Sequence, residues 1–90
     1  MASYVKDPAE KKDYSVDWSL HLVTDTIGTS TWTVETGLTQ TTPAASNTDT
    51  TTTIWLSGGT ADEDYTVTNH VVTAAGREFE RSFVVMVRNL

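Results

Sequence analysis

Residues 65–88 read YTVTNHVVTAAGREFERSFVVMVR, and this stretch largely decides the expected fold. Apolar and polar residues alternate with a period of two on both sides of Ala74-Ala75-Gly76. This pattern is typical of strands with one buried and one solvated face. The short interval between the two runs has the length of a hairpin connection. We therefore expect two antiparallel strands over residues 65–73 and 78–88.

Tyr65 begins this hairpin, directly after the acidic turn Asp62-Glu63-Asp64. Immunoglobulin-like sandwiches place a tyrosine at the start of the penultimate strand, where its hydroxyl bonds back to the upstream backbone. The sequence therefore predicts a tyrosine corner at Tyr65. Hard cations prefer several carboxylate oxygens, but this turn lacks the ligand spacing of a calcium loop, so we expect a solvated turn.

The longest alternation upstream runs from Tyr14 to Leu22 and predicts one strand. Shorter strands are expected over residues 30–35, 38–42 and 50–56, with a loop at 43–47. Six or seven short strands separated by regular turn signals favour an all-β, immunoglobulin-like antiparallel β-sandwich of about seven strands with a short N-terminal arm. A small barrel is the main alternative.

The N-terminal segment differs from the rest of the chain in charge. Residues 1–13 carry equal numbers of acidic and basic groups, whereas residues 14–76 carry seven acids and no Lys or Arg. Asp7-Pro8-Ala9-Glu10 has a capping residue, a proline at the first helical position and a glutamate at the third. We expect residues 1–13 to form an arm or a single helical turn before a sandwich at 14–90. Lys6, Asp7, Pro8 and Glu10 are therefore candidate partner-binding residues.

Trp55 is a fifth candidate, because its neighbours Ile54 and Leu56 point to the opposite face of the expected strand. Either this strand is buried on both faces or Trp55 is exposed to a partner, since tryptophan is enriched at interface hot spots. Trp18 and Trp32 lie on the apolar faces of their strands and are expected in the core.

Composition excludes several classes of function. The formal net charge of −6 disfavours nucleic acid, whose binding depends on Lys and Arg. Without cysteine there is no thiolate metal site or thiol nucleophile, and the short apolar runs predict no membrane span. His21 and His70 are expected to be solvent-facing. No Gly-x-Ser-x-Gly motif occurs, so we expect no catalysis, metal or cofactor.

Several ordered motifs resemble the phage fiber-tail adaptor family, small immunoglobulin-like virion proteins of tailed bacteriophages. The motifs are Lys6-Asp7-Pro8-x-Glu10, residues 13–19 (DYSVDWS), 25–27 (DTI), 30–34 (STWTV), 55–61 (WLSGGTA), 65–69 (YTVTN), 73–77 (TAAGR) and 80–83 (ERSF). The resemblance implies a structural virion protein, assembled in the host bacterial cytoplasm. It would join fiber or receptor-binding components to the tail or neck, in several copies arranged in a ring. Its partners would be tail, neck, fiber or capsid subunits.

Two other functions remain open at the level of the sequence. A capsid decoration or head-tail neck protein would use the same fold on another surface of the particle. A carbohydrate- or cell-surface-binding module would instead use Trp55 as a platform on which a sugar stacks.

Overall fold

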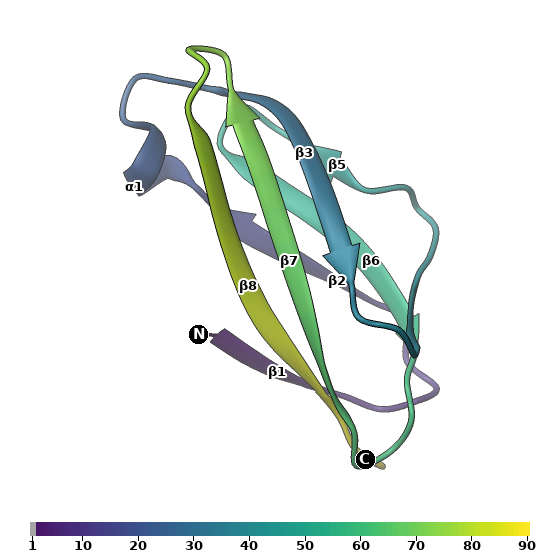
Figure 1. The fold of residues 1–90 in the computed structure, drawn as a ribbon. Coiled ribbons are helices and arrows are strands. Elements are labelled where there is room, and N and C mark those ends of the chain that lie inside the picture. Colours follow the sequence, from purple (N-terminus) through teal and green to yellow (C-terminus); the bar gives the residue numbers. More distant parts are fainter. Residues whose placement is uncertain (1) are drawn as a thin grey trace.

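The expected C-terminal hairpin is present in the computed structural model, which describes residues 2–90 (Figure 1). Strand β7 (Asp64–Thr73) pairs antiparallel with β8 (Glu78–Val87), and Tyr65 lies opposite Val85. Strand β3 (Ile27–Val34) pairs antiparallel with the other edge of β7, and β1 (Ala2–Lys6) pairs in parallel with β8. The first sheet therefore has the order β1-β8-β7-β3.

The second sheet has β6 (Thr51–Gly58) at its centre. Strand β2 (Lys12–Asp17) pairs with one edge of β6, and β4 (Leu38–Gln40) and the two-residue β5 (Ser46–Asn47) also pair with it. The orders β2-β6-β4 and β3-β7-β8 correspond to the B-E-D and C-F-G strands of an immunoglobulin sandwich. The prediction of an all-β, immunoglobulin-like sandwich is confirmed.

The prediction of one strand from Tyr14 to Leu22 is wrong in its second half. Strand β2 ends at Asp17, whose Oδ1 accepts a hydrogen bond of 2.9 Å from the Ser19 N–H, and the four-residue helix α1 (Ser19–Leu22) follows. Trp18 and Leu22 are four residues apart, a spacing that brings them onto one face of a helical turn. Both are buried, whereas Leu20, expected on their face, is 91% exposed.

The N-terminal residues also differ from the expectation of an arm. Ala2–Lys6 forms β1, in register with Phe83 to Val87, instead of a separate segment. The Lys6 side chain has no exposed surface, and its Nζ donates hydrogen bonds to the carbonyl oxygens of Gly58 (2.7 Å) and Asp7 (2.9 Å). The predicted turn after Lys6 forms at residues 8–9 but does not extend into a helix.

A buried polar cluster joins the two sheets at their centre. Trp18 Nε1 donates to Asn69 Oδ1 (3.0 Å) and to Thr52 Oγ1 (3.2 Å), and Thr52 Oγ1 donates to the same Asn69 oxygen (2.7 Å). The Asn69 amide nitrogen donates to Ser30 Oγ and to the Thr31 carbonyl. Trp18, Thr52 and Asn69 are completely buried. The cluster thus ties β6 and the end of β2 to β7 and β3.

Apolar side chains from both sheets surround this cluster. Trp32 is only half-buried and packs against them, in agreement with its expected place in the core. The buried apolar residues are Tyr14, Val16, Trp18, Leu22, Ile27, Leu38, Ile54, Leu56, Tyr65, Val67, Val71, Phe83, Val85 and Val87.

Two buried tyrosines have opposite hydrogen-bonding states. The Tyr65 hydroxyl accepts a 2.9 Å hydrogen bond from the Thr60 N–H, which confirms the tyrosine corner. Gly37, at a φ of +110°, passes so close that a Cβ there would lie 2.7 Å from the Tyr65 ring. The Tyr14 hydroxyl is buried and has no hydrogen-bond partner among residues 2–90. Burial raises the pKa of Tyr14 to about 12.

Asn69→Leu should lower the free energy of unfolding by about 2–4 kcal/mol, because Trp18 Nε1 and Thr52 Oγ1 would lose their shared buried acceptor. Asn47→Leu is the matched control, since Asn47 is exposed and, among residues 2–90, its side chain bonds only to the neighbouring Thr48 carbonyl. Urea denaturation followed by tryptophan fluorescence measures both. Equal losses in the two variants would contradict a structural role for the cluster.

The two tyrosines give a second matched pair. Tyr65→Phe should cost about 1–2 kcal/mol, because the Thr60 N–H loses its acceptor, while Tyr14→Phe should be neutral or slightly stabilising at pH 7. Because the folded chain raises the pKa of Tyr14, folding favours the neutral form of its hydroxyl. The resulting contribution to stability is complete below pH 10 and is lost as the pH rises from 10 to about 12. Denaturation at pH 7 and pH 11 should therefore show a smaller alkaline loss in Tyr14→Phe than in the parent chain. An identical alkaline loss would refute this assignment.

Candidate partner-binding surface

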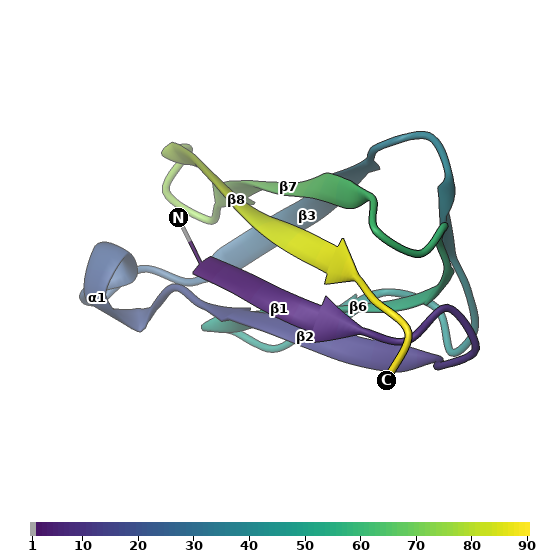
Figure 2. The same ribbon diagram turned by 90° about the horizontal axis from the view of Figure 1, so that it is seen from below.

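Strands β1 and β2 lie side by side along one side of the sandwich, although they belong to different sheets (Figure 2). Each is the outermost strand of its sheet on this side. The Tyr4 ring of β1 lies 5.2 Å from the Tyr14 ring of β2 and 5.4 Å from the Phe83 ring of β8, measured between ring centroids. These aromatic contacts join the two sheets on the side of the sandwich where β1 and β2 lie.

The turn that connects β1 to β2 is fixed by reciprocal hydrogen bonds. Asp7 Oδ2 accepts from the Ala9 N–H (2.8 Å), and Glu10 Oε1 accepts from the Asp7 N–H (2.7 Å). Asp7 Oδ1 also accepts from the Leu90 N–H (3.0 Å), so the turn holds the C-terminal residues against it. The hydrogen bonds from the Leu90 and Ala9 N–H groups, of which the Leu90 bond has the larger effect, hold the pKa of Asp7 below its usual range. Asp7 and Glu10 thus have structural partners, in agreement with the predicted capping pattern.

Of the sequence-based candidates, Lys6 is not available to a partner because its side chain is completely buried. Burial lowers the pKa of Lys6, and the nearby Glu10 and Asp7 carboxylates oppose this shift. Asp7, Pro8 and Glu10 lie together at the turn and are half-buried. The structure thus separates a buried anchor, Lys6, from a partly accessible rigid corner formed by residues 7–10.

Trp55 lies on the outer face of the second sheet, away from the corner formed by residues 7–10. Its neighbours Ile54 and Leu56 are completely buried, while Trp55 itself is half-buried. The Lys11 ammonium lies 5.9 Å from the centroid of the indole ring. The strand is therefore not fully buried on both faces, and Trp55 is partly accessible with a cation beside its ring.

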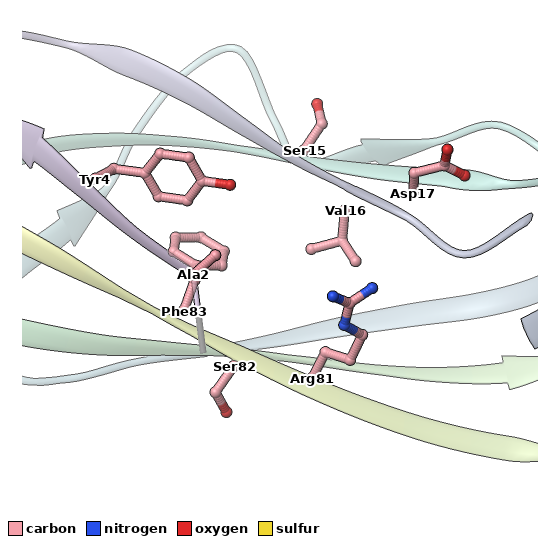
Figure 3. Close-up of a pocket in the computed structure, with 8 residues that line it drawn as sticks. All are labelled: Ala2, Tyr4, Ser15, Val16, Asp17, Arg81, Ser82 and Phe83. Atoms are coloured by element: carbon pink, nitrogen blue, oxygen red, sulfur yellow. The ribbon is translucent and has the colours of Figure 1, made fainter. Parts of the chain in front are cut away.

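A hollow of ≈ 230 Å³ opens between β8 and β2 beyond the start of β1 (Figure 3). Tyr4, Val16 and Phe83 form its apolar walls, and Arg81 extends toward Val16 and Asp17. Ala2, Ser15 and Ser82 complete the lining. The hollow therefore has apolar walls, with the positive charge of Arg81 and the negative charge of Asp17 at its border.

Sequence reasoning missed Tyr4 and Arg81 as residues of this surface. One signal for Arg81 was present: it occupies an inward position between Phe79 and Phe83, where the alternation calls for an apolar residue. Its guanidinium carbon lies 5.9 Å from the Trp18 ring centroid. Tyr4 carried no such signal, because its position depends on the pairing of β1 with β8.

The histidines and the acidic turn lie elsewhere. His21 is exposed with its ring 5.7 Å from that of Trp18, and His70 is half-exposed between Glu78 (3.0 Å) and Glu80 (3.5 Å). Asp64 of the turn pairs with Arg88 at 2.9 Å. Within residues 2–90, no group of three His, Asp or Glu side chains is arranged to hold a metal ion. In the same range, no helix has the length and apolar character needed to cross a bilayer.

Comparison with known proteins gives one family. No curated protein matches the chain. The family model described as podophage GP4 fiber-tail adaptor protein gp77 matches residues 6–86, which include all strands except most of β1 and the last residue of β8. The chain therefore belongs to the Gp77 family of podophage fiber-tail adaptor proteins, as a structural component of a phage particle.

Proposed function

We propose that this protein is an adaptor that joins a fiber or receptor-binding component to the tail or neck of the particle. In this proposal, several copies form a ring that is assembled in the host cytoplasm. The family match over residues 6–86 is the observation that carries the proposal. The geometry adds a reason, because the folded chain is elongated, with principal extents of 42 × 25 × 19 Å. A body of this shape can contact different partners at its two ends.

The two ends of the sandwich have different chemistry (Figure 1). One end holds the β1–β2 turn and the C-terminal residues, where Asp7, Pro8 and Glu10 form the rigid corner. The other end holds α1 and the residue that follows it: Leu20 of α1 is 91% exposed, and Val23, directly after α1, is 85% exposed. Val23 has a φ of +57°, an unusual conformation for a β-branched residue. We call Leu20 and Val23 the apolar tip and propose that it contacts one partner, while the corner contacts the other.

The alternatives use the same fold in other positions. A decoration or neck protein would place these ends against capsid or connector subunits. A carbohydrate-binding module would need the Trp55 ring, and the Lys11 ammonium beside that ring competes with a stacked sugar. The structure thus supports the adaptor proposal over the carbohydrate alternative.

The double variant Leu20→Asp and Val23→Asp tests the apolar tip in phage particles. Both side chains are exposed, so the variant should keep its thermal midpoint while its incorporation, or fiber attachment, falls at least tenfold. Thr33→Asp and Thr31→Asp together form the control, because these exposed residues lie on β3, away from both ends. Quantitative mass spectrometry of purified particles measures the number of copies and of fibers.

Unchanged copy and fiber numbers in the tip variant would remove the tip from the proposal. Cryo-EM of the same particles distinguishes the adaptor from the decoration protein by its position. Truncation of residues 1–12 is not a clean test, since it would delete β1 and the buried Lys6 along with the corner.

A further inference from the structure

The outer edge of β8 is paired along only half of its length. Strand β1 pairs with Phe83 to Val87, and among residues 2–90 no strand pairs with the outer edge of Glu78–Arg81. On the opposite edge, β7 pairs with β8 from Glu78 to Met86. The N-terminal half of β8 is therefore a free sheet edge. Free edges offer unpaired N–H and C=O groups to another strand.

The hydrogen bonds identify which groups are free. The Arg88 N–H donates to the Lys6 carbonyl on the β1 side, whereas the Val87 N–H donates to Glu63 on the β7 side. Backbone groups of successive residues in a strand point to opposite edges, so even-numbered residues of β8 face outward. Glu78 and Glu80 thus present both their N–H and C=O groups to the free edge, whereas Ser82, next to the start of β1, presents its N–H.

The free edge has defined limits. At one end, the ring of His21 in α1 lies 5.8 Å from the Phe79 ring. At the other end, Ala2 begins β1 opposite Phe83. A strand rises about 3.3 Å per residue, so the interval accommodates roughly four or five extended residues. An added strand here would continue the line of β1.

The side chains around this edge define the chemistry of the occupant. Inward-facing residues of an added strand would meet the hollow lined by Tyr4, Val16 and Phe83, which favours an apolar side chain. Its outward-facing residues would lie beside Glu78 and Glu80, two exposed carboxylates that share the single His70 ring between them, and this acidic pair favours Lys or Arg at these positions. The chain's own basic residues do not have this alternating spacing on a strand that is free to pair: Lys6 is buried, Lys11 and Lys12 are adjacent in the sequence, and Arg77, Arg81 and Arg88 lie on β8 or directly next to it. A second copy is therefore a poor match.

We propose that the free edge of Glu78–Ser82 binds an extended segment of another virion protein, in which basic residues alternate with apolar ones. The segment adds a strand to the first sheet beside β8 and places an apolar side chain in the hollow. This inference deepens the adaptor proposal by assigning one contact surface and the chemistry of its partner. The strand-binding proposal is tested on the isolated chain, whereas the adaptor proposal is tested by incorporation into particles. A negative result for strand binding would therefore not decide the adaptor proposal.

The test uses two blocked five-residue peptides, one alternating Lys and Val and the other alternating Glu and Val. Each is titrated to millimolar concentration into the ¹⁵N-labelled chain. With the Lys peptide, the amide signals of Glu78, Glu80 and Ser82 should shift more than those of Phe79 and Arg81, whose N–H groups face β7. The Glu peptide should bind about fivefold more weakly, as expected for two exposed charge pairs.

The double variant Glu78→Lys and Glu80→Lys provides charge reversal and should exchange the preference for the two peptides. The matched control is Glu35→Lys, since Glu35 is exposed and lies after β3, the strand at the opposite edge of the first sheet. No shift at Glu78–Ser82 with the Lys peptide would overturn the proposal, and so would equal binding of the two peptides. Shifts of the same amides with protein concentration alone would also overturn it, by assigning the edge to a second copy.

Discussion

The hydrogen bonds of Asn69 connect the two sheets, and the rest of the structure depends on them. One amide side chain accepts from Trp18 and Thr52 on one side and donates to Ser30 and the Thr31 carbonyl on the other. All four interactions are needed, because a buried polar group without a partner costs about 1–3 kcal/mol. The arrangement fixes how β6 and β7 face each other. It also draws the Trp18 indole inward at the end of β2.

This placement of Trp18 shapes the surfaces that bear on function. With its ring in the core, the chain turns at Asp17 and forms α1, which carries the apolar tip away from the sandwich. Arg81 lies against the same indole and borders the hollow. The edge of β8 beside α1 therefore stays free, while β1 covers the remainder. The buried Trp18 side chain thus connects the core to both the apolar tip and the free edge of β8.

The sequence predicted the parts of the fold that depend on local patterns. Alternation located the hairpin of β7 and β8, and the position of Tyr65 after an acidic turn predicted the tyrosine corner. Pairings between distant segments were missed: β1 has no alternating pattern of its own, and its place depends on β8. Lys6 looked like a surface residue because lysine is almost never fully buried unless it is paired, yet the Gly58 carbonyl, 52 residues away, provides its acceptor. Asp7 and Glu10 were identified by local capping geometry, whereas Tyr4 and Arg81 required the fold.

A cryo-EM reconstruction of the phage particle at side-chain resolution would show where the protein sits and what it contacts. We expect several copies of the sandwich between the tail and the fiber components, with the apolar tip buried in one contact. We also expect an extended strand from a neighbouring protein along Glu78–Ser82 of each copy. Copies found on the capsid surface, or copies whose β8 edge and apolar tip both face solvent, would contradict the proposed adaptor role.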